Sequence, residues 1–242
     1  MKNSKTLKIG LFGGSGRMGQ NVETVVVETK QDPYLFVGKT KSEKFSFSVT
    51  DLKNTEEDIL KDVDVWVEFT SPEGLFELIE RTPYGTPIVS GSTGLSDKQF
   101  AALKKESTKR PLFWASNMSL GLWAFRKALE SFSSISNFDF AVEEIHHTLK
   151  KDKPGGTALT LQKDLEKIVN KKIETPQAHR LGGIFGMHTV YAASQNELIT
   201  FQHQALNRKV FAEGAVQAAL WLSEQKNGFY SMDDMLSKGV KQ

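Results

Sequence analysis

The stretch that decides the fold is Leu7-Lys8-Ile9-Gly10-Leu11-Phe12-Gly13-Gly14-Ser15-Gly16-Arg17-Met18-Gly19. It reads as a short apolar strand followed by a glycine turn. Apolar residues then recur at the spacing of one helix face, at Met18, Val22, Val25 and Val26. Strand, glycine turn and helix form the dinucleotide fingerprint, in which the glycines let the backbone approach a pyrophosphate and the helix start receives its charge. Because the Gly13-x-x-Gly16-x-x-Gly19 spacing is not the commonest form, a tight turn without a ligand is the alternative interpretation.

The following segments repeat this order of strand, polar loop and helix. Apolar strands are expected at residues 34–38, 62–70, 87–90 and 111–115, and helices after residue 74 and at 99–105. The last three strands end in Ser71-Pro72-Glu73-Gly74, Gly91-Ser92-Thr93-Gly94 and Ser116-Asn117-Met118-Ser119. In a doubly wound sheet such carboxyl ends line the ligand crevice. The series therefore predicts an α/β, Rossmann-type, doubly wound parallel sheet.

The pattern changes after a connecting helix expected at residues 121–132. Strands are expected at residues 138–145, near 188–193 and at 197–203, with helices at 157–170 and 211–223. Strands and helices no longer alternate, which predicts a second, smaller mixed α+β domain. We expect residues 1–118 plus 208–242 to form the dinucleotide-binding domain, and residues 119–207 to form the substrate-binding and oligomerisation domain.

Composition excludes several classes of protein. The chain has 242 residues, 39% hydrophobic and 25% charged, as in an ordinary globular protein. A net charge of +2 does not indicate a nucleic-acid-binding surface. Cysteine is absent, which excludes disulfides, thiolate zinc sites and cysteine nucleophiles and is compatible with a reducing compartment. No apolar run is long enough for a secretory signal or a membrane span. We expect a cytoplasmic protein without a nucleic-acid or membrane partner.

Two lysines follow the second expected strand, at Lys39 and Lys41. NAD-selective proteins of this fold usually place an acidic residue there to bind the ribose 2′-hydroxyl. A lysine would instead pair with a 2′-phosphate, so Lys39 is a candidate cofactor-binding residue and NADPH the expected preferred cofactor, with NADH as the alternative.

The segment of residues 142–157 gathers adjacent histidines, lysines and acids between an alternating strand and a helix. A helix start carries unpaired N–H groups and a partial positive charge, which suits an anion. Titratable side chains beside it indicate an active site; the alternative is a solvated loop with a helix cap. We expect no metal at His146 and His147, because no His-Glu-x-x-His spacing is present and neighbouring strand side chains point to opposite faces.

These residues resemble the dihydrodipicolinate reductase family of the diaminopimelate–lysine pathway. The resemblance covers nearly the whole chain. Its most specific part is Glu144-Ile145-His146-His147-x-x-Lys150-x-Asp152-x-Pro154-Gly155-Gly156-Thr157-Ala158. It implies reduction of 4-hydroxy-tetrahydrodipicolinate to tetrahydrodipicolinate with NADPH or NADH by a homotetramer. Two departures are Gly155, where the family commonly has serine, and a short segment at 170–180.

The resemblance also implies roles for individual residues. His146 would be the general acid–base group and Lys150 the proton donor. His147, Gly156 and Thr157 would hold the carboxylates of the substrate. The nucleotide would bind to Gly13, Gly14, Ser15, Gly16, Arg17, Met18, Gly91, Ser92, Thr93, Ala115, Ser116, Asn117 and Met118. The alternatives are a related NAD(P)-dependent reductase with another substrate and a non-catalytic NADPH-sensing regulator. The latter predicts a damaged catalytic segment, whereas this one is intact.

Overall fold

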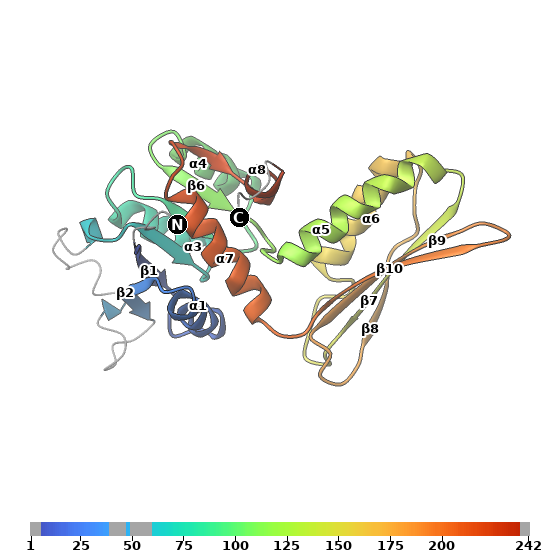
Figure 1. Cartoon of the computed structure of the whole chain (residues 1–242), viewed down its shortest axis with the longest axis horizontal. Coiled ribbons are helices and arrows are strands. Elements are labelled where there is room, and N and C mark those ends of the chain that lie inside the picture. The colour runs from blue at the N-terminus through green and yellow to red at the C-terminus, as the bar shows by residue number, and fades with distance from the viewer. Residues whose placement is uncertain (1–5, 39–46, 49–59, 238–242) are drawn as a thin grey trace. The chain divides into compact units, whose positions relative to one another are not determined.

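The computed structural model describes residues 6–38, 47–48 and 60–237 (Figure 1). The chain divides into two compact units. The first unit comprises Met1–Met118 and Phe211–Gln242, and the second unit comprises Ser119–Val210. Within the described residues, no helix combines the length and the apolar composition needed to cross a membrane.

The first unit is built on a parallel sheet. In the described residues its strand order is β11-β6-β5-β4-β1-β2-β3, and every neighbouring pair is parallel. The strands are β1 (Lys8–Phe12), β2 (Asp32–Gly38), β3 (Phe47–Ser48), β4 (Val65–Glu68), β5 (Ile88–Ser90), β6 (Pro111–Trp114) and β11 (Gly228–Tyr230). The order reverses direction between β1 and β4, and sheets of this type bind ligands beyond the carboxyl ends of the strands at such a point. The predicted Rossmann-type sheet is confirmed.

Helices flank this sheet (Figure 1). Each helix has one apolar face, which is buried by packing against the sheet. They are α1 (Arg17–Glu28), α3 (Pro72–Arg81), α4 (Asp97–Glu106), α7 (Lys209–Leu222, in this unit from Phe211 on) and α8 (Met232–Leu236). The central strands are apolar on both faces, and Ile9, Leu11, Val65 and Trp66 are at most 1% exposed. Such two-sided burial is what a parallel sheet covered by helices requires.

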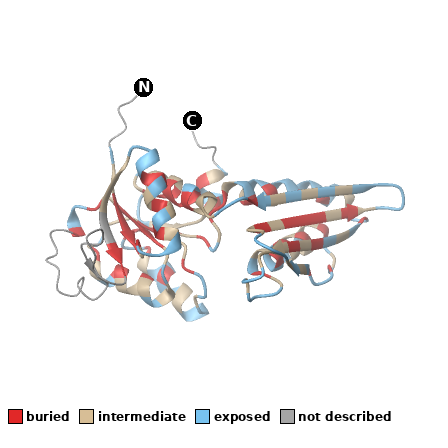
Figure 2. Ribbon diagram, turned by 90° about the horizontal axis from the view of Figure 1, so that it is seen from below, coloured by how far each residue is buried: buried red, intermediate tan, exposed pale blue. Residues whose placement is uncertain are grey.

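The second unit pairs a mixed sheet with a helical layer. Its described strands lie in the order β10-β9-β7-β8; β7 and β9 are antiparallel, as are β9 and β10, whereas β7 and β8 are parallel. They are β7 (Asp139–His146), β8 (Gln177–Arg180), β9 (Gly186–Ala193) and β10 (Leu198–Ala205). One face of this sheet packs with α5 (Leu120–Ala128), α6 (Gly156–Val169) and the 3₁₀ helix η2 (Leu129–Ile135) around a common apolar core. Figure 2 shows these buried stretches in red.

Several elements differ from the sequence predictions, among them β3, β11 and α8, which were not predicted. The strand predicted at residues 62–70 is only β4 (Val65–Glu68), because the Asp64 carboxylate accepts the Lys8 N–H at 2.8 Å before the strand begins. The helix predicted at residues 121–132 becomes α5 and then η2. Serine hydroxyls at 131, 133 and 134 donate to carbonyls three residues back, and such side-chain bonds compete with regular helix. Strand β8 lies in the segment predicted as a short loop.

Candidate active site

The turn between β1 and α1 is closed so tightly that only glycine fits. Gly13 has φ +87°, and a Cβ built there would lie 2.6 Å from Thr70 Cγ2. A Cβ at Gly19 would lie 2.5 Å from the Gly13 carbonyl oxygen. The N–H groups of Gly13 and Gly14 donate to the Val37 carbonyl at 2.9 and 3.0 Å, which fixes the turn against β2. The glycines therefore bring the start of α1 close to the end of β1, as a bound pyrophosphate requires.

Five of the described helices, α1, α3, α4, α5 and α6, start in two different ways. Ser71, Ser96 and Ser119 cap α3, α4 and α5 with a side-chain oxygen that accepts a backbone N–H. In contrast, α1 and α6 begin after a glycine, Gly16 and Gly155, without a side-chain cap. An uncapped start leaves backbone donors and a partial positive charge for an anion. The uncapped starts are the positions where sequence patterns predict a pyrophosphate and a carboxylate.

A buried carboxylate supports the loops after β4 and β5. Glu68 is 0% exposed and accepts the hydroxyls of Ser90 at 2.6 Å and Ser92 at 2.8 Å, together with Thr70. Burial raises the pKa of Glu68, although these hydrogen bonds act in the opposite direction. Because the Ser92 hydroxyl points inward, a nucleotide would meet this loop through its backbone and through Thr93, which is exposed.

The other predicted nucleotide residues fall into exposed and buried groups. Ser15, Gly16, Arg17 and Ser116 are exposed; Gly13, Met18, Gly91 and Asn117 are half-buried; and Gly14, Ala115 and Met118 are buried. The strands that carry these loops are adjacent in the order β6-β5-β4-β1, so their loops follow one edge of the sheet. Lys39 lies outside the described residues.

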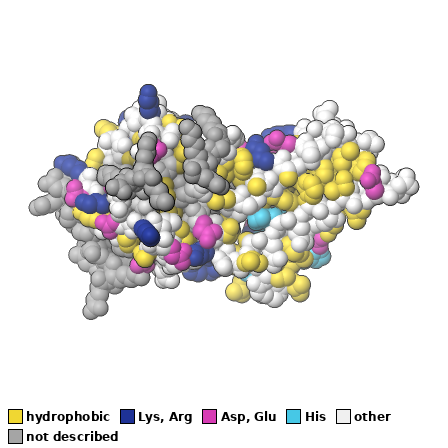
Figure 3. Space-filling model, in the orientation of Figure 1, with side chains coloured by type: hydrophobic (Ala, Val, Ile, Leu, Met, Phe, Trp, Pro, Cys, Tyr) yellow, Lys and Arg dark blue, Asp and Glu magenta, His cyan; other side chains and the backbone are white. Residues whose placement is uncertain are grey.

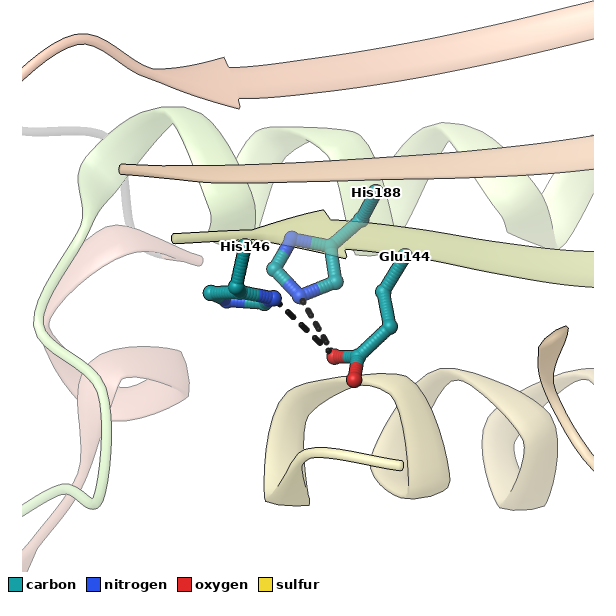
Figure 4. A group of neighbouring side chains, drawn as sticks. All are labelled: Glu144, His146 and His188. Atoms are coloured by element: carbon teal, nitrogen blue, oxygen red, sulfur yellow. Dashed lines mark ion pairs between the residues drawn. The ribbon is translucent and has the colours of Figure 1, made fainter. Parts of the chain in front are cut away.

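In the second unit, strand β7 places Glu144 and His146 on the same face, two residues apart (Figure 4). One oxygen of Glu144, Oε2, lies 3.3 Å from His146 Nδ1 and 3.8 Å from His188 Nε2. His188 lies opposite Glu144 in the register of β7 and β9, and its ring centroid is 5.1 Å from that of His146. The structure thus gathers one carboxylate and two imidazoles at one end of the sheet.

The surroundings of these imidazoles favour their uncharged forms. Burial lowers the pKa of His146; the Glu144 charge opposes this shift, whereas Lys150 and Arg180 reinforce it. Burial, with smaller contributions from His146, His203 and Lys150, lowers the pKa of His188 to about 3. Both shifts favour the uncharged rings at neutral pH.

Lys150 lies in the loop between β7 and α6. Its ammonium group donates to both carboxylate oxygens of Asp152 at 2.7 Å, and this contact lowers the pKa of Asp152. The Arg180 side chain holds the same loop: Nε donates to the Lys150 carbonyl at 3.2 Å, and Nη2 donates to the Asp152 carbonyl. The proton donor that the family resemblance implies is therefore held by a neighbouring acid.

The start of α6 lies against the same cluster. The Gly155 N–H donates to Glu144 Oε1 at 2.8 Å. A Cβ at Gly155 would lie 2.8 Å from Glu144 Oε2 and 2.9 Å from Lys150 Cε. A larger residue would therefore displace these side chains, which explains glycine at this position here. Gly156 is exposed and Thr157 half-buried, so both can meet a ligand.

His147 follows directly after the end of β7. Its ring centroid lies 6.4 Å from that of Phe185. The structure instead adds Glu144, Arg180 and His188 to the predicted site residues. Strand periodicity could have indicated Glu144, because it precedes His146 by two residues. Arg180 and His188 depend on strand register, which the sequence pattern alone does not specify.

The cluster also offers ligands that a divalent ion could use. One donor atom each from Glu144, His146 and His188 lies within 4.8 Å of the others. The Glu144 carboxylate already has a positive partner, because Arg180 Nη2 lies 2.9 Å from its Oε1. A site without metal remains our prediction, since this guanidinium supplies the charge that an ion would bring.

Known proteins resemble this chain along its length. Two family models match, one described as dihydrodipicolinate reductase, N-terminus, at residues 7–118, and one as dihydrodipicolinate reductase, C-terminus, at residues 121–236. A 4-hydroxy-tetrahydrodipicolinate reductase of Bdellovibrio bacteriovorus is 48% identical over 233 residues, covering 96% of this chain and 97% of the relative. One from Nitratiruptor is 35% identical, covering 95% of this chain and 99% of the relative.

A solved structure shares the fold. The dipicolinate-bound dihydrodipicolinate reductase of Paenisporosarcina superposes with a TM-score of 0.75 at 17% identity, covering 96% of this chain and 100% of that one.

Proposed function

The chain belongs to the dihydrodipicolinate reductase family, and we propose that His146, Lys150 and the start of α6 perform its reaction. It is an NAD(P)H-dependent oxidoreductase that reduces 4-hydroxy-tetrahydrodipicolinate to tetrahydrodipicolinate in diaminopimelate and lysine biosynthesis. The observation that supports these assignments most is the arrangement at the end of β7. There the buried carboxylate of Glu144 faces the His146 imidazole and accepts the N–H at the start of α6, and Arg180 links it to the loop of Lys150.

The overall reaction requires one hydride and one proton. In the net reaction the hydride takes the place of the hydroxyl of the substrate ring, and the proton leaves with that hydroxyl as water. When bound, the nicotinamide supplies the hydride. Lys150 is the acid that delivers the proton, and its Nζ is the side-chain donor that contacts Asp152 beside the start of α6. His146, uncharged at neutral pH, accepts and returns protons at the ring.

The carboxylates of the substrate bind at the start of α6. The N–H groups of Gly156 and Thr157 have no capping side chain, and the helix dipole favours a negative charge there. The Thr157 hydroxyl adds a donor, and His147 contacts the second carboxylate. Lys150 turns from Asp152 towards the substrate, exchanging one carboxylate partner for another.

We expect Thr157→Val to weaken the binding of dipicolinate about tenfold, because a hydrogen bond to a charged group contributes roughly 1.5–3 kcal/mol. Dipicolinate is the planar relative of the substrate, and its inhibition constant against the substrate is the measurement. Thr160→Val is the matched control, since the Thr160 hydroxyl donates to the Gly156 carbonyl at 2.9 Å on an exposed part of the same helix. Equal inhibition of both variants and the wild type would place the dicarboxylate elsewhere.

The turn at Gly13–Gly19 fits a dinucleotide, because its glycines leave the approach that a pyrophosphate needs. The loops of residues 91–93 and 115–118 would complete the binding surface. We propose that Lys39 binds the 2′-phosphate and gives a preference for NADPH over NADH. A 2′-phosphate gains a charge-assisted contact from an ammonium group, whereas a neutral hydroxyl gains little.

Lys39→Asp is expected to reverse this preference. The ratio of kcat/KM for NADPH to that for NADH should be on the order of ten in the wild type, because contacts of exposed charges are weakened by solvent. It should shrink as salt rises. Lys30→Asp, at an exposed position after α1, controls for a general loss of positive charge. A wild type that favours NADH, or an unchanged ratio in Lys39→Asp, would refute the role of Lys39.

We also propose a homotetramer that associates through the second unit. The sheet face opposite α5 and α6 carries exposed Leu198, Thr200 and Gln202 on β10, whereas Ile199 and Phe201 pack into the core. Hydrophobic side chains gather over this unit on the face drawn in Figure 3. A second copy of the same sheet is a suitable partner for such a face. The location we propose is the cytoplasm, where the cofactor pool of biosynthetic reductases is maintained.

A further inference from the structure

Glu144 contacts several parts of the site with one carboxylate. It is 0% exposed; Oε1 accepts the Gly155 N–H at 2.8 Å and Arg180 Nη2 at 2.9 Å, and Oε2 faces His146 Nδ1 at 3.3 Å. We infer that Glu144 is the positioning residue of the reaction: it orients the His146 ring by taking its Nδ1–H and, through Arg180, fixes the loop of Lys150. This inference rests on the proposed function, because it presupposes that His146 is the acid–base group.

The burial of the Glu144 carboxylate on this strand face is energetically unfavourable unless the charge is compensated. Glu144 continues the face of β7 that carries Phe140 and Val142, which pack in or against the apolar core. An apolar residue would fit that face at lower cost, because burying a charge requires compensating partners. Arg180 and the Gly155 N–H compensate Oε1. Oε2 has no hydrogen bond within the described part of the chain, and it is the oxygen that faces the histidines.

The orientation of His146 gives Oε2 a function. His146 Nδ1 is also buried and lacks a hydrogen-bond partner among the described residues. A proton on Nδ1 would meet Oε2, and catalytic hydrogen bonds often shorten when a ligand binds. The other nitrogen, Nε2, lies on the side of Gly186, where an added Cβ would come within 3.2 Å. Glycine therefore leaves the reactive side of the ring open, while Glu144 fixes the opposite side.

Arg180 extends this control to the loop of Lys150. Strand pairing places Arg180 beside His146, its partner in the register of β7 and β8. From there its guanidinium reaches the carbonyl groups of Lys150 and Asp152 as well as the Glu144 carboxylate. A planar guanidinium with several donors suits such a multiple contact better than an ammonium group. The Glu144–Arg180 pair thus joins the acid–base histidine, the proton donor and the start of α6.

Several charged or titratable groups face His146. They predict how the pKa of His146 changes when the Glu144 charge is removed. Glu144 and Asp152 raise the pKa of His146, Lys150 and Arg180 lower it, and His188 stays uncharged beside it. Removing the Glu144 charge leaves burial and both cations in place. The pKa of His146 should then fall further, and its proton should no longer be directed to Nδ1.

The test is Glu144→Gln, compared with Glu143→Gln. Glu143 lies on the opposite face of β7, where its carboxylate accepts the Tyr191 hydroxyl at 2.7 Å, so its loss changes the same charge away from the site. The ring nitrogens of His146 are followed by nitrogen-15 NMR across a pH titration, and kcat and KM are measured in parallel. In Glu144→Gln we expect a lower pKa of His146, loss of the Nδ1-protonated tautomer, and a fall in kcat on the order of 10²-fold. The control should match the wild type in all three.

Each outcome decides the inference. A folded Glu144→Gln whose His146 tautomer and pKa match the wild type would overturn it, as would kcat within about threefold of the control. If Glu144→Gln does not fold, Glu144→Asp retains the charge at a shorter reach and is judged by the same His146 signals. If the wild-type protein does not act on the substrate but Glu144→Gln changes the His146 tautomer, the positioning role of Glu144 is supported and the proposed function is refuted. The two claims can therefore fail separately.

Discussion

Replacing His146 by alanine is expected to lower kcat by about 10²–10⁴-fold while leaving NADPH binding unchanged, because general acid–base catalysis contributes an effect of this size. His146 lies in the second unit, at the end of β7, whereas the nucleotide loops belong to the first unit. The measurement is steady-state kinetics with the hydroxylated substrate, together with a separate NADPH titration. Lys150→Ala should behave in the same way, because it removes the proton donor.

Matched controls lie close to both residues. His179 is an exposed histidine on β8, 3.5 Å from Glu143, and Lys151 is the exposed neighbour of Lys150. Their alanine variants should retain wild-type kcat. Near-normal turnover in both His146→Ala and Lys150→Ala would show that protons reach the substrate by another route.

Replacing Arg110 by methionine is expected to destabilise the first unit by about 3–5 kcal/mol, the usual cost of removing one partner of a buried ion pair. Arg110 is 0% exposed. Its guanidinium donates to Thr82 Oγ1 at 2.6 Å and to the Ile79 carbonyl at 3.2 Å, and it lies 3.1 Å from Glu106 Oε1. Methionine fills much of the volume but leaves these acceptors without a donor.

The measurement is the midpoint of denaturant unfolding, followed by far-UV circular dichroism. Lys109→Met is the matched control, because Lys109 contacts the same Glu106 at 3.2 Å from an exposed position. Its effect should be much smaller, since solvent screens exposed pairs. Equal midpoints for the two variants would mean that the burial of Arg110 does not stabilise the unit.

The parts of the fold predictable from sequence are those with a strong local signal. The glycine turn of residues 13–19 and the apolar strands around Val65–Glu68 and Ile88–Ser90 have patterns that only a covered parallel sheet explains. Strand β8 has no such signal. Its sequence, Gln-Ala-His-Arg, lacks an apolar face, and it exists because it pairs with β7 and because Arg180 is fixed by contacts distant in sequence.

The residues of the candidate site also fall into those with a local sequence signal and those without one. His146 and Lys150 belong to one short segment, so a local pattern could indicate them. Arg180 and His188 come from other strands, and their place beside Glu144 follows from register in a folded sheet. Arg110 is a similar case, since a basic residue shortly after a helix is usually exposed. Side chains of this kind acquire their function or their stabilising role only through tertiary contacts.

The most direct test of the account is consumption of NADPH by the purified protein when freshly made product of dihydrodipicolinate synthase is added. NADPH absorbance should fall only with both protein and synthase product present, dipicolinate should slow the reaction competitively, and His146→Ala should abolish most of it. Unchanged absorbance with the folded wild-type protein, or undiminished activity in His146→Ala, would contradict the proposed chemistry of this site.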